Sequence, residues 1–135
     1  MFCRACNQPP ALDLRVNSLR TTPAALLAAF TAAGIEASPL PELPGGLTLL
    51  GRSGDLRALP GYVEGHWCVQ DRAAQAVGRL LDPQPGERIL DACAAPGGKS
   101  THLAELMANQ GEVWAVDRSE GRLRRVGFNA ARLGL

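Results

Sequence analysis

Apolar and polar residues alternate or recur at helical spacing along the first part of the chain. Leu12–Val16 alternates apolar and charged residues, which is typical of a half-buried strand. Thr22, followed by proline, is a helix N-cap, and Gly34 closes the apolar helical pattern between them. The segments 35–40 and 47–50 predict two further strands. The order is therefore β-α-β-β, which indicates a small α+β unit.

A second group of elements begins after residues 60–65. Residues 66–70 resemble a strand, and Asp71 is positioned to cap a helix that ends before Pro83. Residues 88–91 predict a short strand, which leads into the most informative segment of the chain.

The run 91–101 reads DACAAPGGKST and joins that strand to another helical pattern. The adjacent Gly97 and Gly98 allow positive φ and close approach of a ligand to the backbone. The helix start beyond them offers unpaired N–H groups and a partial positive charge. A ligand with a carboxylate or phosphate is therefore the expected occupant.

Three ligand-binding motifs compete for this loop. A phosphate-binding P-loop would need glycine where Cys93 stands, and the dinucleotide fingerprint fails because the two glycines are adjacent. A Rossmann-like methyltransferase loop is less strict, and it predicts a second strand with an acidic residue about 20 positions later, to bind ribose hydroxyls. The segment 111–117 supplies that strand and Asp117. A tight turn without a ligand stays an alternative. A final helix is predicted from Ser119 to Gly134, with arginines on its surface.

Composition adds bounds but does not identify a function. The chain has 135 residues, of which 46% are hydrophobic and 20% charged, and its net charge is +1. These values are typical of a globular protein and do not indicate nucleic-acid binding by charge alone. The sequence contains neither a bilayer-spanning apolar run nor a signal peptide pattern, so we expect a cytoplasmic protein.

Cysteine and histidine positions do not support a metal site or a catalytic triad. Cys3 and Cys6 form one C-x-x-C pair, but the second pair of a zinc site is missing, since Cys68 and Cys93 stand alone. We expect Cys68 in the core and His102 near the surface of the helix that follows the loop.

The loop 91–100 closely resembles the cofactor loop of the Sun-type (Nop/Sun) RNA cytosine-5 methyltransferases. The resemblance continues in 69–71, in 85–91 and in 129–134, in the order in which the family has them. Residues 14–17 resemble the start of the small RNA-binding subdomain of that family. The resemblance covers nearly all of the chain.

This resemblance implies an α/β fold in three parts. Residues 1–11 would be a linker from an upstream domain, and 12–62 a small α+β (β-α-β-β) RNA-binding subdomain. Residues 63–135 would form the first half of a Rossmann-like methyltransferase sheet, with unfinished edges and exposed apolar surface. The chain would then be a fragment without catalytic residues, because the catalytic cysteines of the family lie in later Pro-Cys and Thr-Cys motifs that are absent here.

The resemblance also implies a binding site for S-adenosyl-L-methionine. Backbone amides from Cys93 to Lys99 would surround its methionine part, and Asp117 would accept hydrogen bonds from both ribose hydroxyls. Lys99 would reach the cofactor carboxylate or cap nearby carbonyls, and Asp91 would orient the loop or approach the cofactor amino group. The expected cofactor-binding residues are Asp91, Cys93, Ala94, Ala95, Pro96, Gly97, Gly98, Lys99 and Asp117.

The implied partner is RNA, specifically small-subunit ribosomal RNA methylated at C5 of a cytosine, and the implied state is a monomer. Phosphate contacts in the subdomain would come from arginines, which could equally be solvated surface: Arg15, Arg20, Arg52 and Arg57. The alternatives are a truncated RNA- or cofactor-binding module without catalysis, a small-molecule methyltransferase and a P-loop hydrolase.

Overall fold

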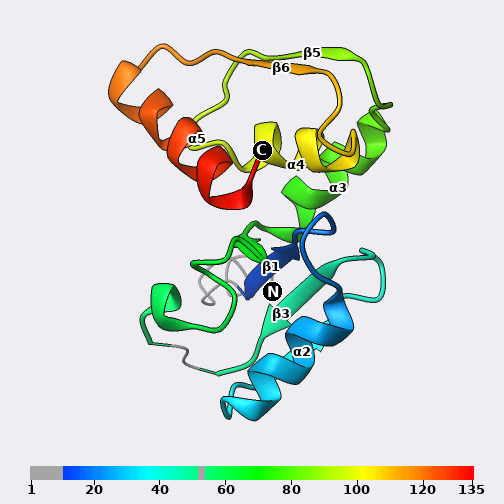
Figure 1. Cartoon of the computed structure of the whole chain (residues 1–135), viewed down its shortest axis with the longest axis vertical. Coiled ribbons are helices and arrows are strands. Elements are labelled where there is room, and N and C mark those ends of the chain that lie inside the picture. Colours follow the sequence, from blue (N-terminus) through cyan, green and yellow to red (C-terminus); the bar gives the residue numbers. More distant parts are fainter. Residues whose placement is uncertain (1–10, 52–53) are drawn as a thin grey trace, which may run out of the picture.

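The computed structural model describes residues 11–51 and 54–135 in two stacked units (Figure 1). A four-stranded antiparallel sheet forms the lower unit, and a two-stranded parallel sheet with its helices forms the upper unit. No helix in these ranges has both the length and the apolar character needed to cross a bilayer.

The lower sheet contains the predicted β-α-β-β order and one further strand. Its strands are β1 (Leu12–Val16), β2 (Ala37–Pro39), β3 (Gly46–Leu49) and β4 (Trp67–Val69), arranged in the order β2-β3-β1-β4. Helix α2 (Pro23–Ala32) connects β1 to β2. The predicted helix and strands are thus present, although β2 is shorter than the apolar segment 35–40 indicated.

The core of the lower unit lies between α2 and the sheet. Thr22 caps α2 by accepting a hydrogen bond from the Ala25 N–H at 3.2 Å, which fixes the direction in which the helix leaves β1. The edge of Trp67 meets Phe30, with ring centroids 6.1 Å apart, a favoured aromatic geometry. The buried cluster consists of Leu14, Val16, Leu26, Phe30, Leu47, Leu49 and Trp67.

Strand β4 contradicts the expectation that residues 66–70 belong to the second unit. It pairs with β1 in antiparallel register, with Cys68 opposite Arg15. The first sheet therefore extends beyond the expected boundary at residue 62, and the 3-10 helix η1 (Leu56–Ala58) lies within the connection. A three-residue apolar strand has no local signal that says which sheet it joins. Its place is set by Trp67, which fills the lower core.

The upper unit has the elements that the sequence predicted. Helix α3 (Arg72–Leu81) precedes strand β5 (Arg88–Asp91), and helix α4 (Gly98–Leu106) connects β5 to the parallel strand β6 (Glu112–Ala115). Helix α5 (Glu120–Leu133) follows β6. Caps of the expected type start α3 and α5, since Asp71 accepts from the Ala73 N–H and Ser119 from the Arg122 N–H.

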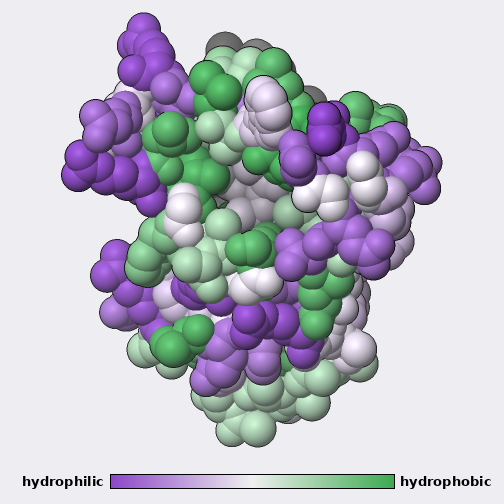
Figure 2. Space-filling view, turned by 45° about the horizontal axis from the view of Figure 1, so that its top comes forward, coloured by the Kyte–Doolittle hydropathy of each residue, from purple (hydrophilic) through white to green (hydrophobic). Residues whose placement is uncertain are grey.

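One face of the upper sheet is exposed, as an unfinished Rossmann-like sheet predicts. Leu90 and Trp114, which lie opposite each other in the register, are 64% and 62% exposed. Figure 2 brings this end of the molecule forward and shows apolar side chains gathered at its surface. The opposite face is covered by α4 and α5, where Val126 packs against Ala94 and Ala95.

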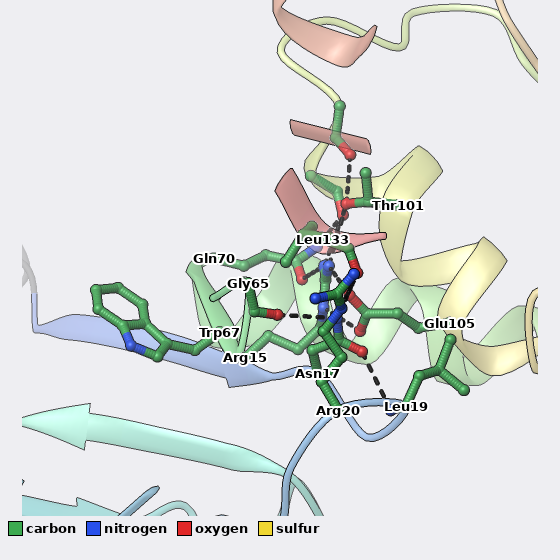
Figure 3. A network of polar contacts seen from close by, with 12 residues as sticks. Arg15, Asn17, Leu19, Arg20, Gly65, Trp67, Gln70, Thr101, Glu105 and Leu133 are labelled. Atoms are coloured by element: carbon green, nitrogen blue, oxygen red, sulfur yellow. Dashed lines mark hydrogen bonds and ion pairs between the residues drawn. The ribbon is translucent and has the colours of Figure 1, made fainter. Parts of the chain in front are cut away.

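A buried polar network joins the two units (Figure 3). Arg15 of β1 is 3% exposed, and its guanidinium donates to both carboxylate oxygens of Glu105 in α4, at 2.9 and 2.8 Å. On the same strand, Asp13 is 3% exposed and accepts two hydrogen bonds from Arg72 of α3. The expectation that β1 is half-buried is therefore wrong, because its charged face is covered by the upper unit.

The arginines expected to contact RNA phosphates differ in their surroundings. Arg15 is buried in the network, so the expectation is wrong for this residue. Arg20 donates to the carbonyls of Leu133 and Glu64, at 2.9 and 3.0 Å. Arg57 is exposed, and Arg52 lies outside the described residues.

His102 is buried, contrary to the expectation that it lies near the surface. It is 3% exposed and packs on Gly78, where a Cβ atom would lie only 2.5 Å from His102 Nδ1. Glycine at that position lets α3 and α4 approach closely enough to enclose the imidazole. Burial, together with the charges of Arg15 and Arg79, lowers the pKa of His102 to about 3.

Glu105→Ala should destabilise the full-length protein by about 3–5 kcal/mol, because it leaves the Arg15 guanidinium buried without its counter-ion. The double variant Arg15→Met, Glu105→Met should recover most of that loss, since it removes both charges and retains apolar volume. Urea denaturation measures the free energy of unfolding of each variant. A double variant as unstable as the single one would contradict this account.

Acid should destabilise the protein through His102. The unfolded chain protonates this group near pH 6.5, whereas the folded protein resists protonation until about pH 3, so lowering the pH between these values favours unfolding. The expected slope is at most about 1.4 kcal/mol per pH unit. His102→Gln should flatten the curve of unfolding free energy against pH, measured by urea denaturation.

Glu105 contributes to the pH dependence of stability with the opposite sign. Burial raises its pKa, although Arg15 opposes this, so its protonation on acidification favours the folded state. The carboxyl is present in both proteins, and the difference between their two curves therefore isolates His102. Parallel curves would contradict the prediction.

Candidate functional site

The loop between β5 and α4 lies at the carboxyl ends of both parallel strands. The Ala94 N–H donates to the Val116 carbonyl, and the Val116 N–H donates to the Asp91 carbonyl, both at 2.9 Å. These bonds bring the loop 92–97 beside Asp117, which follows β6. In open α/β sheets, ligands bind at this end of the strands.

Helix α5 holds the loop from one side. The Arg122 guanidinium donates to the Ala95 carbonyl at 3.0 Å, and the Asn129 side-chain amide donates to the Pro96 carbonyl at 2.9 Å. Arg122 and Asn129 are seven residues apart, which places them two turns apart on one face of the helix. That spacing is a signal from which their shared role could have been predicted.

The other side of the loop is held by α4 and by the lower unit. The Thr101 hydroxyl donates to the Gly97 carbonyl at 2.7 Å. The Gly98 carbonyl accepts from Arg15 Nη1 at 2.7 Å and from Gln70 Nε2 at 3.2 Å. No sequence signal connected Arg15 or Gln70 with this loop.

With these carbonyls engaged, the loop presents N–H groups to a ligand. Gly97 is the N-cap of α4, has φ 105° and provides no side-chain cap. The N–H groups of Gly98, Lys99 and Ser100 have no acceptor within the described residues. Three free amides at the positive end of a helix form a site for an anionic group.

Asp117 lies beside these amides as an ionised acceptor. Its two carboxylate oxygens accept from the Ser119 N–H at 2.9 Å and from the Ala95 N–H at 3.2 Å. The bond from Ser119 does most to lower the pKa of Asp117, while burial acts in the opposite direction. Each oxygen keeps a further lone pair for a ligand hydroxyl.

Asp91 acts on the loop itself. Its carboxylate accepts from the Ser100 hydroxyl at 2.7 Å and from the Cys93 N–H at 3.3 Å. Of the two roles left open by the sequence, loop orientation is therefore the one that these contacts support. The Ser100 contact was not predicted from the sequence, because the two residues are nine positions apart.

The remaining predicted residues differ in exposure. The Ala94 and Ala95 side chains are buried and Pro96 is exposed, so the alanines anchor the loop. The Cys93 thiol and the Lys99 side chain are exposed. Lys99 makes no hydrogen bond or ion pair within the described residues, so its predicted contact with a ligand carboxylate stays a prediction.

The site has the chemistry of a binding site for a small anion that also carries hydroxyl groups. In residues 11–51 and 54–135, no three metal-binding side chains cluster, and the pair Cys3 and Cys6 lies outside these ranges. Free amides would bind the anion, and Asp117 would accept from two adjacent hydroxyls.

Two family models match the sequence in consecutive parts. Residues 1–54 match the ferredoxin-like domain of RsmF/B-like methyltransferases, and residues 78–135 match the 16S rRNA methyltransferase RsmB/F model. The "Probable ribosomal RNA small subunit methyltransferase B" of Synechocystis is 46% identical over 134 residues. Ribosomal RNA small subunit methyltransferase B of Klebsiella pneumoniae is 47% identical over 131 residues.

Solved structures agree with these matches. A methyltransferase homologue from Pyrococcus horikoshii superposes with a TM-score of 0.88 and 33% identity, over 97% of this chain and 43% of that one. The structure of NSun6 from the same organism with SFG gives a TM-score of 0.84 at 21% identity, over 92% of this chain and 55% of that one, which shows a shared fold.

The matches cover nearly all of this chain but less than a third of each curated relative. The matches cover 99% of this chain for the Synechocystis protein and 97% for the Klebsiella protein, but 30% of each relative. The chain thus spans about 30% of the length of these curated relatives. Two models of one family and these relatives lead to one conclusion: the chain belongs to the Sun-type family of RNA methyltransferases, in its RsmB/F branch.

Proposed function

We propose that the full-length protein transfers a methyl group from S-adenosyl-L-methionine to C5 of a cytosine in small-subunit ribosomal RNA. In this proposal the present chain carries the cofactor-binding half of the enzyme. The observation that carries it is the row of free amides at Gly98, Lys99 and Ser100 beside the ionised Asp117. The rRNA substrate is supported by the relatives, which are named as ribosomal RNA small subunit methyltransferases.

The residues of the site fit the proposed cofactor. The amides at the start of α4 would bind the methionine carboxylate, and Asp117 would orient the ribose through both hydroxyls. Lys99 would supply a cation at the same carboxylate, and the segment from Cys93 to Gly98 would enclose the methionine chain. When bound, S-adenosyl-L-methionine supplies an electrophilic methyl group.

The described residues contain no suitable nucleophile for the cytosine ring. Methylation at C5 needs a thiolate that adds at C6 and a second group that removes the C5 proton. Cys68 is buried, and burial raises the pKa of its thiol, which disfavours the thiolate. Cys93 lies in the loop that we propose binds the cofactor, so we do not assign it the role of nucleophile. In our proposal these two groups therefore come from outside this chain.

RNA contact is proposed for exposed arginines of η1 and α5. Arg57 in η1 and Arg125 in α5 are exposed, and no contact of their side chains is recorded within the described residues. Arg124 pairs with Glu120 at 3.0 Å on the surface, an interaction that phosphate could replace. A cytoplasmic location and a monomeric state are parts of this proposal.

A binding module without catalysis is the second candidate. It is favoured by the absence of Pro-Cys and Thr-Cys from the sequence. Incubation of the full-length protein with 16S rRNA and tritiated S-adenosyl-L-methionine separates the two. We expect tritium in the RNA and one protected cytosine on bisulfite sequencing, whereas binding without transfer would favour the module.

Asp117→Asn should weaken cofactor binding by about 10- to 100-fold, because hydrogen bonds to a charged acceptor are worth about 1.5–3 kcal/mol. Calorimetric titration of the full-length protein with S-adenosylhomocysteine measures the effect. Asp71→Asn is the matched control, since Asp71 caps α3 without contacting the loop. Equal affinity of the Asp117 variant and the wild type would overturn the assignment.

A further inference from the structure

We propose that Arg15 is a positioning residue for the cofactor site, although it lies in the other unit. Rather than touching the ligand, it fixes the peptide group that follows Gly98 and thereby orients the Lys99 N–H. This inference rests on the proposed function, because it assumes that the amides at the start of α4 bind the cofactor.

The geometry of one peptide group carries the argument. Arg15 Nη1 donates to the Gly98 carbonyl at 2.7 Å. In a planar trans peptide, the carbonyl of one residue and the N–H of the next point in opposite directions. Because Arg15 holds the Gly98 carbonyl from the side of the lower sheet, it fixes the direction of the Lys99 N–H, one of the three free amides.

The same contact also strengthens the amide as a donor. A cation hydrogen-bonded to a carbonyl polarises the whole peptide group, and chains of hydrogen bonds in a low-dielectric interior reinforce one another. Arg15 is 3% exposed and Glu105 5% exposed, so water screens the contact little. The Lys99 N–H should therefore bind an anion more tightly with Arg15 in place.

Three neighbours keep the guanidinium in this position (Figure 3). Glu105 accepts from Nε and Nη2, which sets the plane of the group, and Gln70 Oε1 accepts from Nη1 at 2.5 Å. The Thr101 hydroxyl accepts from Nη2 at 3.1 Å. With its other donors engaged, the guanidinium keeps Nη1 directed at the Gly98 carbonyl. A lysine at this position could pair with Glu105 but could not reproduce the planar set of contacts.

Gln70 supports the same carbonyl from the segment between the two units. Its Nε2 donates to Gly98 O at 3.2 Å, while its Oε1 accepts from Arg15. Arg15 and Gln70 thus form a two-residue clamp on Gly98. The clamp joins β1 of the lower sheet to the first turn of α4.

The test is the affinity of the full-length protein for S-adenosylhomocysteine, measured by calorimetry. Arg15→Lys retains the charge beside Glu105 and loses the Gly98 contact, so we expect about tenfold weaker binding. Gln70→Met removes the weaker contact and should weaken binding about threefold. RNA affinity, measured by filter binding, should change less than twofold in both variants.

Arg72→Lys is the matched control. Arg72 donates twice to Asp13, so it joins the same strand β1 to α3 without touching the loop. We expect its cofactor affinity to stay within twofold of wild type, even if its melting temperature falls. A loss equal to that of Arg15→Lys would show that general loosening is responsible and would overturn the inference.

The remaining outcomes separate the inference from the proposed function. Wild-type affinity in Arg15→Lys, with a wild-type protein that binds S-adenosylhomocysteine, overturns the inference alone. A wild-type protein that does not bind this ligand overturns the proposed cofactor site. If Arg15→Lys shows no cooperative melting transition, the test rests on Gln70→Met. Unchanged affinity for S-adenosylhomocysteine in that variant would overturn the inference.

Discussion

The burial of one guanidinium underlies the arrangement of this protein. Arg15 leaves water at a large desolvation cost, which is offset only because Glu105 supplies the opposite charge and other acceptors complete its hydrogen bonds. Arg15 and Glu105 are 90 positions apart in the chain. Their pairing fixes how α4 lies on β1, and with it the place of the loop that precedes α4.

The candidate site follows from how the loop's polar groups are distributed. Carbonyls of the loop face protein donors from three elements, including Arg122 of α5 and Thr101 of α4. The N–H groups at the start of α4 stay unpaired, and Asp117 stands next to them with its own orientation fixed by two backbone bonds. The protein thus satisfies the acceptors of the loop internally and leaves donors for a ligand.

Local chemistry made much of this predictable from the sequence. Thr22, Asp71 and Ser119 cap helices through contacts with residues two or three positions away, so their neighbours alone specify them. The loop and the place of Asp117 beside it could likewise be predicted, because the two glycines, the strand and the aspartate lie close together in the sequence. The membership of β4 in the lower sheet and the burial of Arg15 depend on partners that are distant in the chain, and period and composition cannot identify such partners.

The passage from the lower sheet to α3 has a mechanical consequence. Gln70 is the one residue between the end of β4 and the Asp71 cap, and its own N–H donates to the Asp13 carbonyl at 3.1 Å. This bond ties the connecting residue to β1. The short, hydrogen-bonded connection therefore limits how far α3 can move relative to the lower sheet.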